Sequence, residues 1–191
     1  MEGHAGGSAP RSSPRGMSAA DDAESHRQHR AEAERLGPLR VALLTVSDTR
    51  DFETDRSGRF LAESLRQEGH QVLDYRLVRD EPAEIDGALG DLLRSPAQAI
   101  LVNGGTGLSS RDGTYEVVRR RLDKTLPGFG ELFRMLSYQE IGAAAMLSRA
   151  TAGLCEGRIL VSLPGSPAAV RLAWEKLLRP ELRHLVREAA R

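Results

Sequence analysis

Apolar and polar positions follow one another along the chain in blocks typical of buried strands and amphipathic helices. The segment Leu39 to Val46 is almost continuously apolar, which indicates a strand buried on both faces of a parallel sheet. A helix is predicted from about Ser57 to Glu68, and Gly69 follows at the position where a glycine ends a helix. The alternation from Val72 to Val78 then predicts a second strand.

The same order continues beyond this second strand. Pro82 suits the first turn of a helix, and two further strands are predicted from Ala99 to Val102 and from Ile159 to Leu163. Apolar stripes at helical spacing are formed by Ile85, Leu89, Leu92 and Leu93, by Val170, Trp174, Leu177 and Leu178, and by Leu182, Leu185, Val186 and Ala189. Strands that alternate with helices predict an α/β fold with a mainly parallel sheet and right-handed crossovers.

Two of the predicted strands run directly into loops that could bind an anion. Asn103 to Gly107 contains three glycines, and Pro164 to Pro167 follows the later strand. Parallel sheets bind ligands at the carboxyl ends of their strands, where backbone N–H groups and a helix start can hold phosphate. The first loop matches neither the Walker A nor the dinucleotide fingerprint. Both loops are also consistent with simple turns and helix starts.

Acidic residues follow the same strand ends. Asp112 comes just after the glycine loop, and Asp80 and Glu81 come directly after the second strand. A carboxylate beside a phosphate site repels the phosphate unless a cation intervenes, so this pairing indicates Mg²⁺. The alternative is that Asp112 is a solvated helix cap and that Asp80 and Glu81 form a helix N-terminal turn, where acids are favoured.

Composition divides the chain into two parts. Residues 1–38 contain no Val, Ile, Phe, Tyr or Trp, and a segment of that kind cannot bury enough apolar surface to offset the entropy of ordering it. We therefore expect a disordered tail at 1–38, within which Met17 is an alternative start. Residues 39–191 have the size of one ordinary domain.

Charge, cysteine usage and hydropathy exclude several classes of protein. The 27 basic and 27 acidic residues cancel, which argues against a protein that holds nucleic acid through phosphate contacts. No apolar run approaches the ~20 residues that span a bilayer, and no signal-peptide core is present, so a cytoplasmic protein with no membrane partner is expected. A single cysteine, Cys155, excludes an internal disulfide, and we expect it to be buried.

Other chemistries have little support in the sequence. The histidines include no pair at metal-binding spacing within the domain, and no serine-nucleophile elbow is present. Pro127 to Glu131 is predicted as a glycine-flexed loop that leads into an apolar helix containing Leu132, Phe133, Met135 and Leu136. That apolar helix could be ordinary core or a subunit interface.

Several short motifs stand in a fixed order from Val41 to the C-terminal region. They are Thr45-Val46-Ser47-Asp48, Asp55 with Ser57-Gly58, Gly69-His70, Gly104-Gly105-Thr106-Gly107, Arg111-Asp112-x-Thr114, Pro127-Gly128-Phe129-Gly130-Glu131, Arg134 to Ser137, Ser148-Arg149 and Leu163-Pro164-Gly165-Ser166. In this combination the chain closely resembles the MoaB/MogA family of molybdenum cofactor biosynthesis proteins. The segment from Gly128 through Trp174 is more similar to MoaB. At Asn103 and Tyr115 the family usually has Thr and Pro.

The resemblance implies a three-layer α/β/α domain, with a mostly parallel central sheet, that assembles into homotrimers or homohexamers. It also implies binding of molybdopterin and Mg²⁺-dependent transfer of AMP from ATP to the terminal phosphate of molybdopterin, with release of pyrophosphate. A non-catalytic molybdopterin-binding or scaffold protein of the same pathway is the alternative.

The resemblance further implies roles for individual residues. Asp80 and Asp112 correspond to the two family acids, which makes them the expected catalytic residues and Mg²⁺ ligands, and the loop argument selects the same pair. The residues expected to bind substrate or phosphate are Ser47, Asn103, Gly104, Gly105, Thr106, Gly107, Arg111, Glu131, Arg149, Pro164, Gly165 and Ser166.

Overall fold

A six-stranded sheet in the order β2-β1-β3-β6-β5-β4 forms the centre of the molecule. The structure is a computed structural model that describes residues 36–109 and 112–191. Its strands are β1 (Arg40–Val46), β2 (Gln71–Val78), β3 (Ala99–Asn103), β4 (Lys124–Thr125), β5 (Thr151–Cys155) and β6 (Arg158–Leu163). Strands β2, β1, β3 and β6 are parallel, and β5 and β4 add an antiparallel edge. The predicted mainly parallel sheet is confirmed.

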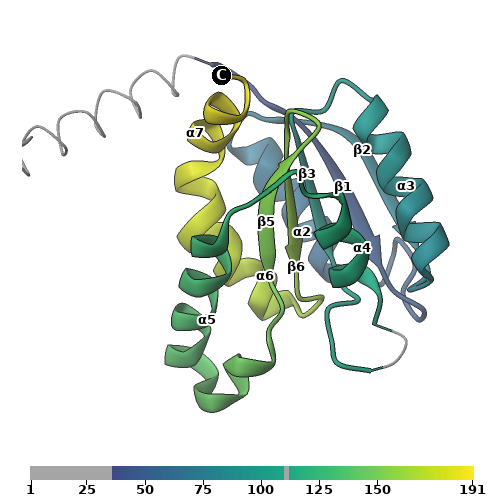
Figure 1. Ribbon diagram of the computed structural model, residues 1–191, viewed down its shortest axis with the longest axis vertical. Helices are drawn as coiled ribbons and strands as arrows, with labels where there is room; N and C mark the ends of the chain where they lie inside the picture. The colour runs from purple at the N-terminus through teal and green to yellow at the C-terminus, as the bar shows by residue number, and fades with distance from the viewer. Residues whose placement is uncertain (1–35, 110–111) are drawn as a thin grey trace, which may run out of the picture.

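Helices cover both faces of this sheet. They are α2 (Arg56–Gln67), α3 (Pro82–Arg94), α4 (Thr114–Arg121), α5 (Pro127–Ile141), the 3₁₀ segment η1 (Gly142–Leu147), α6 (Pro167–Ala173), the π-helical segment η2 (Trp174–Leu178) and α7 (Arg179–Ala189). Helices α3 and α4 pack on one face, and α2, α5, α6 and α7 pack on the other. Figure 1 shows α5 and α7 to the left of the sheet and α3 and α4 to its right. The fold is the expected three-layer α/β/α arrangement.

Burial on both faces explains why the first strand is almost continuously apolar. Successive side chains of a strand point to opposite faces. Val41 and Leu43 pack into the core shared with α2, α5, α6 and α7, whereas Ala42 and Leu44 pack into the core shared with α3 and α4. All four side chains are fully buried.

The predicted boundaries of the first helix are confirmed to within one residue. Asp55 caps α2 by accepting a hydrogen bond from the Gly58 N–H at 3.0 Å. Gly69, at φ +78°, follows the helix in the left-handed conformation that ends it. Cys155 is buried and free, as expected.

The prediction for the segment 127–131 was wrong. Pro127 occupies the first turn of α5, and the helix continues through both glycines, so no flexed loop precedes it. A proline lacks the N–H that a first helical turn leaves unsatisfied, which explains why it starts a helix here. Phe129 and Phe133, one turn apart, anchor α5 in the core. The sequence patterns also missed the short strand β4 and the strand β5.

The first described residues include the position at which the domain was predicted to start. Leu39 is fully buried, and its carbonyl accepts a hydrogen bond from the Gln71 N–H at 2.8 Å. Almost all of the predicted tail, residues 1–35, lies outside the described residues. Within 36–109 and 112–191, no helix combines the length and the hydropathy needed to cross a bilayer.

Candidate functional site

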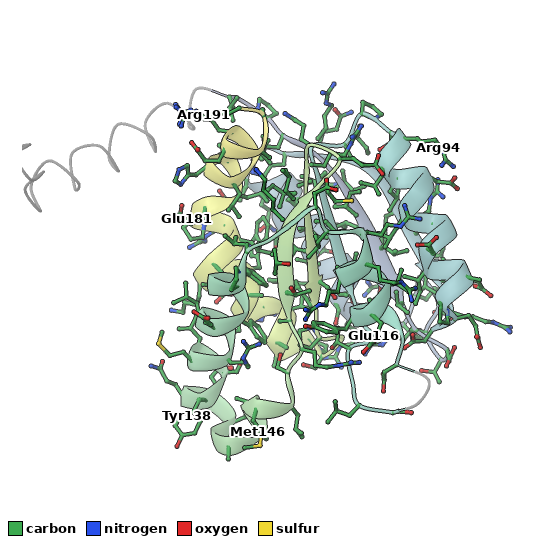
Figure 2. The ribbon with its side chains drawn as sticks, viewed as in Figure 1. Arg94, Glu116, Tyr138, Met146, Glu181 and Arg191 are labelled. Carbon is green, nitrogen blue, oxygen red and sulfur yellow. The ribbon has the colours of Figure 1, made fainter. Side chains whose placement is uncertain are left out.

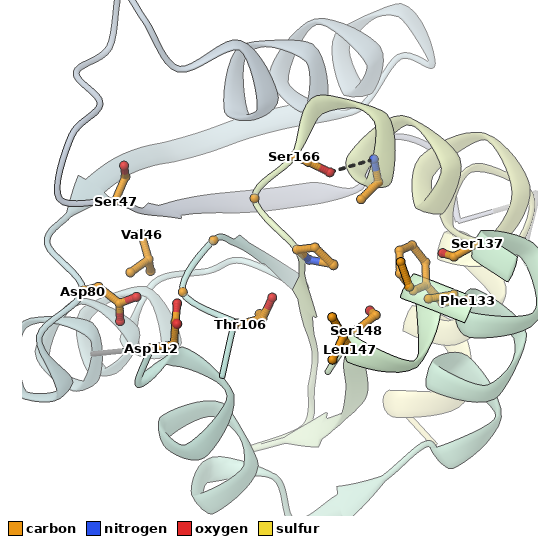
Figure 3. Close-up of a pocket in the computed structure, with 18 of the residues that line it drawn as sticks. Val46, Ser47, Asp80, Thr106, Asp112, Phe133, Ser137, Leu147, Ser148 and Ser166 are labelled. Carbon is orange, nitrogen blue, oxygen red and sulfur yellow. Dashed lines mark hydrogen bonds between the residues drawn. The ribbon is translucent and has the colours of Figure 1, made fainter. Parts of the chain in front are cut away.

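A pocket of about 500 Å³ opens at the carboxyl edge of the parallel strands. The ends of β1, β3 and β6 are in register, with Thr45 opposite Asn103 and Asn103 opposite Leu163. The loops that follow these strands therefore begin at one level. Figure 3 shows Ser47, Asp80, Asp112 and Thr106 on one side of the pocket and Phe133, Leu147 and Ser148 on the other.

The glycine loop forms the floor of the pocket, with Gly104, Gly105, Thr106 and Gly107 all lining it. Gly104 and Gly105 have φ angles of +102° and +60°, which side-chain-bearing residues rarely adopt. A Cβ at Gly104 would overlap with the carbonyl oxygen of Val46. The N–H groups of Gly105, Thr106 and Gly107 form no hydrogen bond within the described part of the chain. Three consecutive donors are therefore available to an anion.

Asp80 and Asp112 lie side by side against this loop (Figure 3). A Cβ at Gly105 would stand 2.6 Å from Asp80 Oδ2, and one at Gly107 would stand 2.6 Å from Asp112 Oδ2. Asp80 Oδ1 accepts a hydrogen bond from the Gly113 N–H at 3.1 Å, and Asp112 Oδ2 accepts one from the Ser109 N–H at 2.8 Å. The structure thus brings the two predicted acids and the glycine loop together.

The donor set of this corner suits a hard cation. Two carboxylates face the loop, and the buried Thr114 hydroxyl, which also packs against Gly105, has no partner in the described part of the chain. Mg²⁺ takes oxygen ligands and commonly uses one or two carboxylates together with substrate phosphates. No group of three or more His, Cys, Asp or Glu side chains within 36–109 and 112–191 is arranged to hold a metal alone. The residues therefore fit a magnesium ion that is shared with a bound phosphate.

One arginine and a third carboxylate complete the polar side of the pocket. Asp48 accepts a hydrogen bond from the Asp80 N–H at 3.1 Å. Arg50 Nη1 donates to the Gly165 carbonyl at 3.0 Å and lies 3.9 Å from Asp55 Oδ1. Among the described lining residues, Arg50 carries the only guanidinium or ammonium group. The sequence prediction missed both Asp48 and Arg50, although they follow the first strand directly.

Asp55 links Arg50 to the strands and the helix behind it. This fully buried carboxylate accepts hydrogen bonds from Thr45 and Tyr75 and also caps α2. Burial, and then the hydrogen bond and charge of Asp55, raise the pKa of the Tyr75 hydroxyl well above its ordinary value. Tyr75 therefore stays protonated and acts as a hydrogen-bond donor to Asp55.

The second loop closes the pocket beside the glycine loop. Pro164, Gly165 and Ser166 line the pocket as predicted. The Gly165 carbonyl accepts from Arg50 and also from the Ser57 hydroxyl at 2.8 Å. Ser166 caps α6 by accepting from the Ala169 N–H at 3.3 Å, which is the dashed line in Figure 3. This loop therefore has the helix-start role that was its alternative interpretation, and it also faces the ligand space.

The opposite wall of the pocket is largely apolar and was not predicted. It comes from α5 and η1, which supply Phe133, Ile141, Ala144, Ala145 and Leu147 together with the polar Ser137 and Ser148. The apolar run in α5 could have indicated this wall, but nothing in its pattern separates residues that face a ligand from residues that face the core. The pocket thus has one polar side, where loop N–H groups and carboxylates could hold a phosphate, and one apolar side, which we call the apolar slot.

Three of the described residues that were predicted to bind do not line this pocket, and a fourth predicted residue falls outside the described part of the chain. Asn103 is buried beneath the loop and donates to the Thr45 hydroxyl at 2.8 Å. Glu131 is an exposed residue of α5. Arg149 lies on the other side of the glycine loop. Arg111 lies outside the described residues.

Comparison with known proteins is consistent across sequence and structure. A family model described as a probable molybdopterin binding domain matches residues 42–184. The molybdenum cofactor biosynthesis protein B of Halalkalibacterium halodurans is 51% identical over 163 residues, covering 84% of this chain and 95% of that protein. All described residues that line the pocket, from Val46 to Ala169, lie within the matched range.

Solved structures agree with this match. A crystal structure of a molybdenum cofactor biosynthesis protein B has a TM-score of 0.77 and 47% identity, covering 80% of this chain and 96% of that one. The tungsten cofactor synthesizing protein MoaB from Pyrococcus furiosus has a TM-score of 0.75 and 34% identity, covering 81% of this chain and 98% of that one.

Proposed function

The chain belongs to the molybdenum cofactor biosynthesis protein B family, whose domain is described as molybdopterin-binding, and on that premise we propose that it is a molybdopterin adenylyltransferase. The reaction transfers AMP from ATP to the terminal phosphate of molybdopterin. The observation that carries the proposal is the corner where three loop N–H groups, without a partner among the described residues, lie beside the carboxylates of Asp80 and Asp112. Loop donors and carboxylates together suit a magnesium-bound polyphosphate.

The chemistry requires positioning more than a protein nucleophile. An oxygen of the molybdopterin phosphate attacks the α-phosphorus of ATP, the bond from that phosphorus to the bridging oxygen breaks, and pyrophosphate leaves with the electron pair. Both reactants are anions, so the reaction needs charge neutralisation and in-line alignment. Mg²⁺ held by Asp80 and Asp112 would supply neutralisation. The N–H groups of Gly105 to Gly107 and the guanidinium of Arg50 would orient the phosphates.

The apolar slot gives this proposal a place for the pterin. Phe133, Ile141 and Leu147 offer a surface for a flat ring, and Ser137 and Ser148 offer hydroxyls to its polar edge. Sites for small ligands commonly pair apolar walls with a few placed polar groups. Cys155 is free and buried, which suits the cytoplasmic location included in the proposal.

We also include assembly into homotrimers or homohexamers in the proposal. An apolar surface runs along α5 and η1, and Figure 2 shows Tyr138 and Met146 projecting from it, away from the body of the molecule. Its exposed side chains that do not line the pocket are Leu126, Leu132, Met135, Tyr138 and Met146. Contiguous exposed apolar side chains of this kind mark interaction sites. The mass of the protein in solution, measured by light scattering after gel filtration, tests this part.

The alternative is a non-catalytic molybdopterin-binding protein of the same pathway. The apolar slot by itself would serve a binder, but a binder has no need for paired acids beside a phosphate loop. The deciding experiment incubates the full chain with molybdopterin, Mg²⁺ and ATP labelled at the α-phosphate. We expect labelled adenylyl-molybdopterin and an equal amount of pyrophosphate. Tight binding of molybdopterin without either product would refute the enzyme and support the binder.

A further inference from the structure

Arg149 lies next to the glycine loop and donates hydrogen bonds to its backbone carbonyls. Its Nε donates to the Thr106 carbonyl at 2.9 Å, and its Nη2 donates to the carbonyls of Gly107 and, at 3.3 Å, of Asp112. One side chain therefore binds Gly107, which precedes positions 110 and 111, and Asp112, which follows them. Arg149 does not line the main pocket.

These contacts fix the directions of peptide groups that face the pocket. A trans peptide is planar, so its C=O and N–H point in opposite directions. When Arg149 holds the carbonyl of Thr106, the N–H of Gly107 points away from Arg149, and Gly107 is a residue that lines the pocket. When Arg149 holds the carbonyl of Asp112, the N–H of Gly113 must also point away, and this N–H does donate to Asp80 Oδ1.

The guanidinium is itself held in place by two neighbours on α4. Nη1 forms an ion pair with Glu116, and the guanidinium carbon lies 4.9 Å from the centre of the Tyr115 ring. The ion pair and the ring contact thus add to the hydrogen bonds that hold the guanidinium against the loop backbone. Most donors of Arg149 are therefore committed to the protein.

We propose that Arg149 is a positioning residue that aims the Gly107 N–H group and, through the Gly113 N–H, the Asp80 carboxylate at the substrate phosphates. The inference rests on the proposed function. Arg149 was expected to bind a phosphate directly, but that role would need donors directed into the pocket, which Arg149 does not line. Glu116 and Tyr115 act through Arg149. A planar guanidinium can reach several carbonyls at once, whereas the ammonium group of lysine is a compact charge that cannot match this fork.

The test compares Arg149→Lys with Arg149→Ala, because lysine keeps the charge and loses the fork. As a matched control we use Arg171→Lys, since Arg171 also lies over an aromatic ring, Phe60 at 4.5 Å, and pairs with a glutamate, Glu175 at 3.7 Å. Within the described part of the chain, Arg171 forms no hydrogen bond or ion pair with the glycine loop, and it does not line the pocket. The full chain is used throughout, and thermal melting confirms that each variant is folded.

We expect both Arg149 variants to lower kcat by about tenfold or more, with a smaller change in KM for ATP, because misdirected donors fail in the transition state. The control should keep kcat within about twofold. If Arg149→Lys retains wild-type kcat, the charge suffices and the proposal is overturned. A lower melting temperature with unchanged kcat in both variants would also overturn it, because that result describes a purely structural role.

A second readout needs no substrate and separates this inference from the proposed function. In ¹H–¹⁵N spectra of the free protein, the amide signals of Gly107 and Gly113 should shift in Arg149→Lys, and the Gly113 amide should exchange faster with solvent. The control variant should leave both signals in place. Unchanged Gly107 and Gly113 amides would refute the positioning role even if the wild-type chain proves to be an active adenylyltransferase. Shifted amides in a chain without activity would refute only the proposed function.

Discussion

The glycine loop at 103–107 and the loop at 164–166 follow neighbouring strands, yet they are held in different ways. The second loop is short, and α6 begins at Pro167, directly after its capping residue Ser166. The first loop is longer, and α4 begins only at Thr114, with no side-chain cap. Its shape depends instead on positive φ angles and on Arg149 reaching the loop from a distant position in the sequence.

This difference shows how two loops at one edge of a sheet can have different roles. The loop at 164–166 forms a wall of the pocket, and the loop at 103–107 offers hydrogen-bond donors to a ligand. In the second loop, the Gly165 carbonyl and the Ser166 hydroxyl are already satisfied by protein donors. In the first loop, the Gly105 carbonyl accepts from the Thr114 N–H and the carbonyls of Thr106 and Gly107 accept from Arg149, whereas the N–H groups of Gly105 to Gly107 have no partner in the described part of the chain. Unsatisfied donors cost stability when they are buried, and a bound anion recovers that cost.

The largest effect should come from adding a methyl group to each loop in turn. Gly104→Ala places its Cβ onto the Val46 carbonyl at φ +102°, so we expect a loss of about 3 kcal/mol or more in the free energy of unfolding. Gly165→Ala meets the Gly104 Cα at 3.1 Å without a positive φ, and about 1 kcal/mol is expected. Urea denaturation measures both, and equal losses would contradict the distinction between the loops.

The next effect concerns chemistry at the first loop. Asp112→Asn keeps an oxygen that can accept from the Ser109 N–H but removes the negative charge. We expect turnover to fall by about 100-fold, the scale of losing one electrostatic partner of the transition state, while molybdopterin affinity changes by less than about threefold. Steady-state kinetics and equilibrium titration give the two values. Unchanged turnover would show that Asp112 binds no catalytic metal.

A smaller effect should appear when the cap of the second loop is removed. Ser166→Ala deletes the acceptor for the Ala169 N–H, and loss of a cap costs about 1 kcal/mol. Ser166→Asn retains a capping oxygen and serves as the control, with a loss of a few tenths of a kcal/mol at most. Urea denaturation would contradict the capping role if both variants were equally stable.

The smallest effect should be a pH dependence of stability at His70, which directly precedes β2 at the end of the sheet opposite to both loops. His70 Nδ1 accepts from the Leu39 N–H at 3.1 Å, and burial, followed by the charge of Arg183, lowers the pKa of His70 below its ordinary value of 6.5 despite nearby Glu68. The unfolded chain therefore binds the proton more readily, so stability is full above about pH 6.5 and falls as the pH drops below it.

Thermal melting from pH 7.5 to pH 5.5 should show a decrease of a few degrees at most from this group. His70→Gln, which has no titrating ring, should reduce the pH dependence in that range. Molybdopterin affinity at pH 7.5 should not change, because His70 lies far from the pocket edge of its strand. A steeper pH dependence in the variant would contradict the assignment.

Much of the fold and half of the site followed from local sequence. Local patterns predicted these features, because each depends on only a few neighbouring residues. They are the continuous apolar strands, the glycine after α2 and the acids that follow strand ends. Asp80 and Asp112 could be paired from the sequence because parallel strands end at one edge.

The rest depended on contacts between distant segments. Arg149 has the same charge whether it faces a phosphate or three carbonyls, and only the fold shows which of these it meets. Arg50 was missed for the same reason, because its contact with Gly165 spans 115 positions. The short β4 has too few residues for a periodic pattern, and Pro127 was read as a loop residue because prolines start helices and turns alike.

The ends of β1, β3 and β6 are in register, and this alignment limits where residues can be inserted into the chain. One residue added inside any of these strands would advance its loop by about 3.3 Å and turn the following side chains to the opposite face. The turn at Glu156 and Gly157 connects β5 to β6 at the far edge of the sheet. Insertions between species should therefore accumulate at that far edge, where extra residues leave the three loops aligned.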